Sequence, residues 1–227
     1  MSGTGPARLT VNGVELLADP AGAAVWPERR TLVVADLHLE KGSAFAARGR
    51  PLPPYDTART LGRLDACLAR HRPERVICLG DSFHDGDAAG RLAAADAARL
   101  REMTAAHEWI WVSGNHDPAP PTDRGGRIEA EVTLGALVLR HAARPGAAGE
   151  VSGHYHPKAA VRVRGRRLAG RCFVGDGRRL VLPAFGAYAG GLSVLDPAIA
   201  GLFADGFRVH ILGRRGVFGY PRAALAP

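Results

Sequence analysis

The chain has 227 residues and carries 30 lysines and arginines against 22 aspartates and glutamates, a formal net charge of +8. No apolar run approaches the roughly 20 residues that span a bilayer, and the first ten residues lack the basic and apolar regions of a signal peptide. These features exclude a membrane-spanning protein and predict a soluble, cytoplasmic one. The three widely spaced cysteines follow no zinc-type pattern, and Cys67 and Cys78 are expected to be buried thiols.

The positive charge favours an acidic or phosphate-bearing partner. Only Lys41 and Lys158 are lysines, and an arginine skew beside abundant alanine and glycine is typical of a composition bias. Most of these arginines are therefore expected to form an ordinary solvated surface, and the charge is a weak signal of function.

Short apolar runs predict strands, and two longer segments predict helices. The strands are expected over Leu9–Val11, Val14–Leu17, Thr31–Ala35, Arg75–Leu79, Trp109–Val112, Leu137–Leu139, Ala159–Val163 and Arg179–Leu182. The first two flank Asn12-Gly13, a strong hairpin signal. Leucines at helical spacing predict a helix from Thr57 to Arg70, and a segment rich in alanine, leucine and arginine predicts another from Asp87 to His107.

The order of these elements indicates the fold class. The first half alternates strand and helix, which is typical of parallel strands joined by crossover helices. The second half, from about Glu129, consists mostly of strands and turns. The sequence therefore predicts one α/β domain over residues 1–227, built on two packed sheets.

Polar side chains that can bind metals follow five of the chain's segments, at the points where predicted strands end. In open α/β sheets, ligand sites lie beyond the carboxyl ends of the strands. Each residue alone has an ordinary interpretation, such as a surface histidine, a turn aspartate or a capping asparagine. Together, in order and next to glycines, they favour one metal site. The residues are Asp36, His38, Asp81, Asn115, His141, His154 and His156.

The spacing within this set is informative. In an extended chain, residues i and i+2 point to the same side. Asp36 with His38, and His154 with His156, are therefore expected to direct two donors each at one place. The glycines before Asp81, Asn115 and His154 are expected to allow a tight turn and close backbone approach.

The donor set combines oxygen and imidazole without thiolate. This argues against structural zinc and favours manganese, iron or magnesium. Seven ligands exceed the needs of one ion, so two ions that share a bridging carboxylate fit better. Paired ions about 3.5–4 Å apart are a recurring arrangement for phosphate ester cleavage.

These motifs, Asp36-x-His38, Gly80-Asp81, Gly114-Asn115-His116-Asp117, His141 and Gly153-His154-x-His156, resemble the calcineurin-like metallophosphoesterase superfamily. The resemblance implies a two-sheet β sandwich flanked by helices, a four-layer α/β/β/α fold. It also implies that Asp36, His38 and His156 hold one metal. Asn115, His141 and His154 then hold the other, and Asp81 bridges the two.

A narrower resemblance covers most of the chain. "DLHLEKGSAFAARG", "LPPYDT", "LGDSFHD" and "LPAFGAYAGGL" are similar to the ligase-associated DNA damage response endonucleases, the PdeM family. The "FHD" after Asp81 also resembles nuclease subunits of double-strand-break repair complexes. These likenesses imply a manganese-dependent phosphodiesterase that acts on DNA in repair and is encoded beside a ligase and a helicase. Fe, Mg or Zn remain open as alternative metals.

The remaining candidate residues surround the expected metals. His116, next to Asn115, is the candidate for protonating the leaving group, and His84 is the second candidate, with a surface histidine as its alternative interpretation. Several basic residues are candidates for contacts along a nucleic acid backbone. Two of them, Arg162 and Arg164, are expected to share one strand face, and their alternative interpretation is an ordinary solvated surface. This substrate-binding set is Lys41, Arg48, Arg162 and Arg164.

Three functions remain open from the sequence. The first is a phosphodiesterase on DNA, mainly single-stranded and without sequence specificity, since no motif for base reading is present. The second is a phosphodiesterase or phosphatase on small molecules such as cyclic nucleotides or nucleotide-sugar esters. The third, a scaffold without catalysis, ranks last because every ligand position is filled. The sequence leaves a homodimer open.

Overall fold

The computed structural model describes residues 5–119 and 125–226. The chain begins with an antiparallel hairpin of β1 (Ala7–Val11) and β2 (Val14–Ala18). Its turn residues Asn12 and Gly13 have φ angles of 49° and 79°, as a tight hairpin with two positive φ angles requires. The hairpin predicted from Asn12-Gly13 is thus confirmed.

The first sheet has seven strands in the sequential order β1 to β7. Strands β4 to β7 run parallel to one another, as the alternation of strands and helices predicts. Every residue of β4 is buried, because its side chains are covered on both faces of the sheet. The strands after the hairpin are β3 (Ala24–Trp26), β4 (Thr31–Val34), β5 (Arg75–Leu79), β6 (Glu108–Val112) and β7 (Arg127–Glu129).

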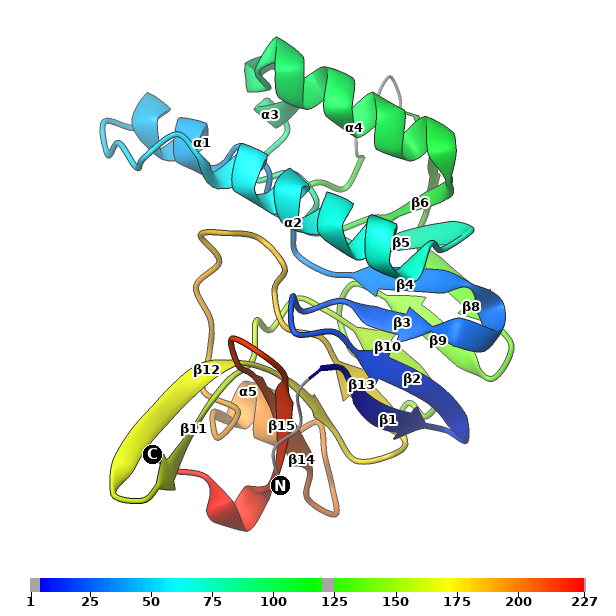
Figure 1. Cartoon of the computed structure of the whole chain (residues 1–227), viewed down its shortest axis with the longest axis vertical. Helices are drawn as coiled ribbons and strands as arrows, with labels where there is room; N and C mark the ends of the chain where they lie inside the picture. Colours follow the sequence, from blue (N-terminus) through cyan, green and yellow to red (C-terminus); the bar gives the residue numbers. More distant parts are fainter. Residues whose placement is uncertain (1–4, 120–124, 227) are drawn as a thin grey trace.

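Four helices lie on one face of this sheet in Figure 1: α1 (Lys41–Ala47), α2 (Asp56–His71), α3 (Ala88–Arg91) and α4 (Ala94–Ala106). Helix α2 confirms the helix predicted over Thr57–Arg70, and its leucines at positions 61, 64 and 68 are buried. The helix ends at His71, because the next residue, Arg72, has a left-handed φ of 43° that excludes a further helical turn.

The single helix predicted from Asp87 to His107 is wrong, because the segment forms two helices. Leu92 and Ala93 between them have ψ angles of 126° and 142°, which are not helical. Arg91 at the end of α3 binds Asp85 and Ser43 through its guanidinium, while Leu100 and Met103 of α4 are buried under the helix layer. Each helix is thus held by different contacts, which override the helical propensity of the alanine-rich segment.

The second sheet holds the C-terminal half of the chain. Its strand order is β15-β14-β12-β13-β10-β9-β8, and β11 pairs with β12 beside this path. The strands are β8 (Glu131–Leu134), β9 (Leu137–Arg140), β10 (Glu150–Ser152), β11 (Lys158–Val163), β12 (Arg166–Gly175), β13 (Arg179–Val181), β14 (Arg208–Leu212) and β15 (Val217–Pro221). Short helical segments complete the fold: η1 (Pro27–Arg29), α5 (Pro197–Ala200) and η3 (Arg222–Ala224).

Three apolar clusters hold the layers together. The first joins the inner faces of both sheets, with Val33 and Ile77 on one side and Leu139 and Phe173 on the other. The second lies between the first sheet and α2 and α4, and the third packs Ile199 of α5 against the second sheet. The two-sheet sandwich flanked by helices is therefore confirmed.

The three cysteines are free and buried, as expected for Cys67 and Cys78. Among the helices in the described part of the chain, none is long and apolar enough to cross a membrane.

Candidate metal centre

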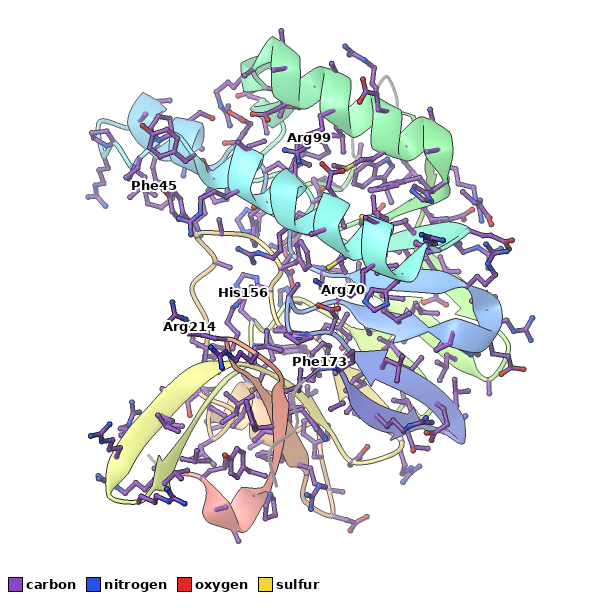
Figure 2. The ribbon with its side chains drawn as sticks, in the orientation of Figure 1. Phe45, Arg70, Arg99, His156, Phe173 and Arg214 are labelled. Atoms are coloured by element: carbon purple, nitrogen blue, oxygen red, sulfur yellow. The ribbon has the colours of Figure 1, made fainter. Side chains whose placement is uncertain are left out.

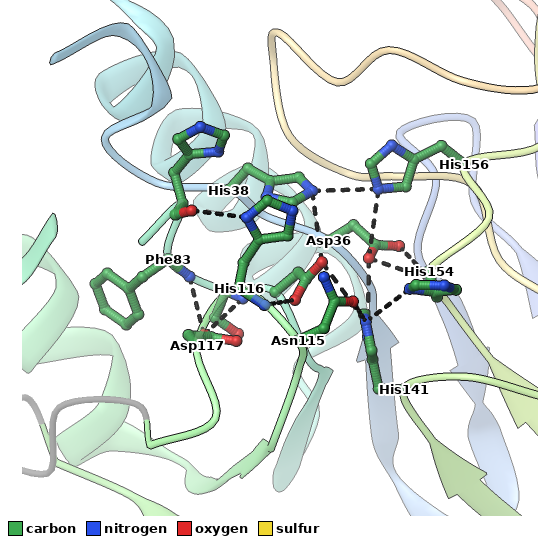
Figure 3. A network of polar contacts seen from close by, with 12 residues as sticks. Asp36, His38, Phe83, Asn115, His116, Asp117, His141, His154 and His156 are labelled. Carbon is green, nitrogen blue, oxygen red and sulfur yellow. Dashed lines mark hydrogen bonds and ion pairs between the residues drawn. The ribbon is translucent and has the colours of Figure 1, made fainter. Parts of the chain in front are cut away.

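The seven predicted metal-binding residues come together at one edge of the two sheets. Figure 3 labels all of them except Asp81, which lies beside His141. Asp36 and His38 follow β4, Asp81 follows β5, and Asn115 follows β6. These strands are parallel, so their carboxyl ends meet at the same edge. The second sheet adds the other three side chains from the segments after β9 and β10: His141, His154 and His156.

One group consists of Asp36, His38 and His156. The Nε2 atoms of His38 and His156 lie 3.2 Å apart, and Oδ1 of Asp36 is 3.5 Å from Nε2 of His156. Two ligand atoms on one ion, with bonds near 2.1 Å, are separated by about 3.0–3.4 Å. The spacing of this group therefore fits the ligands of a single ion.

A second group surrounds the ring of His141. Its Nε2 lies 2.8 Å from Oδ1 of Asn115 and 3.1 Å from Nδ1 of His154. The Nδ1–H of His141 donates to the carbonyl oxygen of Leu79 at 2.9 Å. Because a carbonyl only accepts hydrogen bonds, this contact leaves the Nε2 lone pair free to face a metal.

Asp81 lies between the two groups. Its Oδ2 is 3.5 Å from Nε2 of His141 and 4.0 Å from Nε2 of His38. Its Oδ1 accepts a hydrogen bond from the backbone amide of His116 at 2.8 Å, which fixes the carboxylate. One oxygen between the two groups is the arrangement that a shared ligand requires.

The protonation of His38 also fits a metal ligand. Burial, followed by the nearby charges of His156 and Lys41, lowers the pKa of His38 to about 2. The ring is therefore neutral near pH 7, and a neutral imidazole is the form that binds a metal. The donor chemistry, the spacings and the fixed ring of His141 together fit two divalent ions.

The backbone of the ligand segments differs from the extended chain expected at the i, i+2 pairs. Asp36 and His38 have φ angles of 53° and 44°, and His154 and His156 have φ angles of 71° and 48°. Asp36 and His38 do reach one group, but His154 and His156 reach different groups. The second pair thus reaches two neighbouring groups rather than one. Because both pairs have left-handed backbone, the period-2 alternation of a strand does not decide which group a side chain reaches.

The glycines next to the ligands allow the close packing that the sequence predicts. A Cβ at Gly80 would lie 2.4 Å from Nδ1 of His141, and one at Gly114 would lie 2.2 Å from the backbone nitrogen of Asp81. A Cβ at Gly153 would come 2.8 Å from a carboxylate oxygen of Asp36. A side chain at any of the three positions would push the ligand segments apart.

His84 and His116 stack beside the first group, with ring centroids 5.3 Å apart and planes 22° apart. The Nδ1–H of His116 donates to the backbone carbonyl of His84 at 2.9 Å, so its Nε2 stays available for proton transfer. His84 is buried, which contradicts its alternative interpretation as a surface histidine. Burial, then the charge of Lys41, lowers the pKa of His84 to about 4.

Comparison with known proteins identifies the family that has this centre. Residues 29–163, which include all seven predicted ligands, match the calcineurin-like phosphoesterase family. The chain belongs to this family. It is therefore a metal-dependent phosphoester hydrolase, with His and Asp clusters that fit divalent ions. No curated protein matches the chain.

Among solved structures, the phosphoesterase is similar to the nuclease MPE of Pseudomonas putida, with 31% identity, 95% of this chain and 100% of that chain covered, and a TM-score of 0.75. This agrees with the narrower resemblance to the ligase-associated endonucleases. Yfce, a phosphoesterase from E. coli, has 15% identity over 84% of this chain and 98% of its own, with a TM-score of 0.43.

Two of the predicted substrate-binding residues lie beside the centre of the phosphoesterase. The ammonium of Lys41 lies 5.9 Å from the ring centre of Phe45, and its charge acts on both His38 and His84. Arg48 also acts on His84, and its Nη2 is 3.9 Å from Oδ2 of Asp85. Both cations therefore face the side of the centre that carries the histidine pair.

The structure does not bring the other two substrate-binding candidates to the centre. Arg162 is exposed near the end of β11, and Arg164 lies in the turn after it with a φ of 49°. The prediction that they share a strand face is wrong, because the strand ends at Val163. Lys158 begins β11, and six residues of strand span about 20 Å, so the turn with Arg164 lies about that far from Lys158. The hairpin of β11 and β12 points away from the helices in Figure 1.

The sequence does not reveal one supporting segment, residues 184–186. The amides of Phe185 and Gly186 donate to the carbonyls of Ala35 and Asp36 at 2.8 and 3.1 Å. These bonds hold the backbone that carries the first ligand. Backbone amides donate whatever the residue type, so these bonds leave no pattern in the sequence. The signal that points to this segment is the stretch "LPAFGAYAGGL", which contains it and is similar to the ligase-associated endonucleases.

Proposed function

We propose that the protein is a two-metal phosphodiesterase that cuts DNA strands internally. The observation that carries this proposal is the position of Asp81, whose Oδ2 lies 3.5 and 4.0 Å from histidine nitrogens of the two ligand groups. The ions, when bound, would neutralise phosphate charge and supply a water of lowered pKa. We propose manganese for both, and the two sites are Asp36, His38 and His156, and Asn115, His141 and His154, with Asp81 shared.

His116 is the proposed general acid. Its Nδ1–H donates to the His84 carbonyl, which fixes the ring. Because His116 is exposed, a substrate can reach its Nε2. A protonated Nε2 would donate its proton to the leaving oxygen of the ester. His84 supports this ring by stacking and by its carbonyl, and orients the phosphate.

Four cations are proposed to contact the substrate at different distances. Lys41 and Arg48 are proposed to contact phosphates next to the scissile bond, and the effect of their charges on His84 supports this proposal. Arg162 and Arg164 would contact backbone phosphates far from it. All such contacts are to the backbone, which predicts binding without sequence specificity.

DNA is the proposed substrate for three reasons. The chain is similar to a nuclease over nearly its whole length, its net charge is +8, and its motifs resemble ligase-associated endonucleases. The same resemblance supports a role in repair together with a ligase and a helicase, and it fits a single cytoplasmic domain over residues 1–227.

The test is the cleavage of covalently closed circular single-stranded DNA, which has no ends. We expect the purified protein with Mn²⁺ to linearise the circles and a chelator to stop it. A chromogenic diester measured in parallel reports the chemistry independently of the target. Intact circles beside efficient cleavage of a cyclic nucleotide or nucleotide-sugar ester would establish a small-molecule phosphodiesterase instead. No cleavage of either with any divalent ion would refute catalysis.

A further inference from the structure

A cavity lined by arginines lies on the other side of the segment 184–186. Its volume is about 590 Å³, and it is bounded by the chain start, the β2–β3 turn, α2, β12 and the β14–β15 turn. Asp19 is the one carboxylate among the described residues of its lining. Five arginines line it: Arg63 and Arg70 of α2, Arg171 of β12, and Arg214 and Arg215 of the β14–β15 turn.

The single carboxylate is already engaged. Oδ2 of Asp19 accepts from Arg70 at 2.6 Å and from Nε2 of His71 at 2.7 Å. Within residues 5–119 and 125–226, no carboxylate lies within 4.0 Å of the guanidinium of the four other arginines. The cavity therefore carries a strong excess of positive charge.

Two of these cations are partly withdrawn from water. Arg63 donates to the carbonyl of Phe185 at 2.6 Å, and Arg171 donates to the carbonyl of Ala184 at 2.5 Å. Burial, followed by the charge of Arg63, lowers the pKa of Arg171 to about 10. Burial, followed by the charge of Arg59, also lowers the pKa of Arg63. Partly buried cations without an anion are costly, so a bound anion would stabilise this cluster.

The cavity lies one peptide segment from the metal centre. The carbonyls of residues 184 and 185 face the cavity arginines, whereas the amides of residues 185 and 186 bind the backbone at Ala35 and Asp36. Figure 2 labels Arg70 and Arg214 of this cavity and His156 of the metal centre in one view. The cavity and the metal centre therefore share the backbone segment 184–186 as a common wall.

We propose that this arginine cavity binds a backbone phosphate of the DNA strand whose scissile bond lies at the metal centre. The inference rests on the proposed function and extends its substrate contacts. A guanidinium group can donate two parallel hydrogen bonds to two oxygens of one phosphate, whereas an ammonium group acts as a single point charge. Arginines therefore suit a phosphodiester better than lysines do. Arg214 and Arg215 are exposed on a turn, so the ligand arrives from solvent rather than being a buried structural ion.

The decisive variant is Arg214→Glu/Arg215→Glu, because neither side chain has a structural partner in the described part of the chain. The control is Arg101→Glu/Arg178→Glu, which changes the charge equally at exposed positions on α4 and before β13. Cleavage of circular single-stranded DNA by the Mn²⁺-loaded enzyme is measured at subsaturating DNA over a range of salt. A small chromogenic diester and thermal unfolding are measured for each protein.

We expect the Arg214/Arg215 variant to lose tenfold or more of its DNA cleavage rate at low salt, on the order of two phosphate contacts. Its slope against log salt should fall by about 1.4. Hydrolysis of the small diester should match the wild type, and the control pair should change little in either assay. Should the glutamates unfold the turn, Arg214→Gln/Arg215→Gln is expected to give about the same loss in slope, because it removes the same two phosphate contacts.

Equal losses in the Arg214/Arg215 and Arg101/Arg178 variants would overturn the inference, because net charge alone would then explain them. Normal DNA cleavage by the Arg214/Arg215 variant would also overturn it, and weaker binding of added inorganic phosphate by this variant than by the wild type would then assign the cavity to free phosphate. If the wild type hydrolyses the small diester but spares all DNA, the proposed function fails at its substrate. The inference then fails as well, and the diester assay shows that the choice of DNA as substrate is wrong while the phosphodiesterase chemistry is present.

Discussion

Asp81 is the residue on which the proposed two-metal centre depends. Its Oδ2 lies between His141 and His38, so Asp81→Ala removes a contact to both ligand groups. Metal ions contribute several kcal/mol of transition-state stabilisation, so we expect kcat/KM on a small diester to fall on the order of 10³-fold. Metal content should fall as well, while circular dichroism stays native. The exposed Asp205→Ala serves as control, and activity within tenfold of the wild type would rule out a shared ligand.

His116 gives a prediction about leaving groups. Because its Nδ1–H is bound to the His84 carbonyl, only Nε2 can donate to the leaving oxygen. We expect His116→Ala to lower kcat by about 10²–10⁴-fold on esters with poor leaving groups. The loss should be much smaller for a nitrophenolate, which needs no proton.

The His116 measurement is made with both metals still bound, as elemental analysis would show. His107→Ala is the matched control, since this histidine lies at the end of α4, where its Nδ1 contacts the carbonyl of Pro73. Equal losses on good and poor leaving groups would assign His116 a role other than general acid.

The residue types of the centre were predictable, but their backbone was not. Aspartate, histidine and asparagine at strand ends follow from donor chemistry, which a sequence carries directly. Asp36, His38, His154 and His156 have left-handed φ angles, and the amides of the first three donate hydrogen bonds to other segments. For example, the amide of His38 donates to the carbonyl of Asp81, a residue of another loop. Such long-range contacts leave no local pattern.

At the scale of elements, the same distinction holds. Helix α2 was predictable because its leucines repeat at the helical period. Helix α1 was missed because its seven residues, from Lys41 to Ala47, bury only Gly42 and Ala44 and show no apolar stripe. The break between α3 and α4 was also missed, because it depends on Arg91 binding Asp85 and Ser43.

Asp19 joins two elements and gives a prediction about stability. Burial raises the pKa of Asp19, but hydrogen bonds from His71, the Ala21 amide and Arg70 lower it more, so the net pKa lies below 3.8. A lowered folded-state pKa stabilises the protein above pH 3.8, and this stability is lost as the pH falls through the folded value.

We therefore expect Asp19→Asn to lower the free energy of unfolding by about 1.5–3 kcal/mol at pH 7, because it weakens hydrogen bonds between charged groups. The difference from the wild type should shrink once the pH falls below 3.8, where the native carboxylate becomes protonated too. Urea denaturation at pH 7 and near pH 3 measures both values. A difference that is the same at both pH values would show that the charge of Asp19 does not matter.

At the scale of the whole molecule, the metal centre joins the two sheets. Asp36, His38, Asp81 and Asn115 come from the first sheet, and the three other histidine ligands come from the second. The close contacts of Asp36 with His156 and of Asn115 with His141 cross between the sheets. Bound ions would therefore act on the packing of the sandwich as well as on catalysis.

This position makes metal removal a test of the whole fold. A ligand that binds only the folded state at 100 times its Kd stabilises that state by about 2.7 kcal/mol. For a chain of this size we expect Mn²⁺ to raise the melting temperature by about 5–10 °C above the value in a chelator. Differential scanning calorimetry of the wild type and Asp81→Ala measures the effect, and the variant should lose most of the rise. An equal rise in both proteins would mean that Mn²⁺ binds elsewhere, and no rise in either would mean that the ligand groups do not hold ions between the sheets.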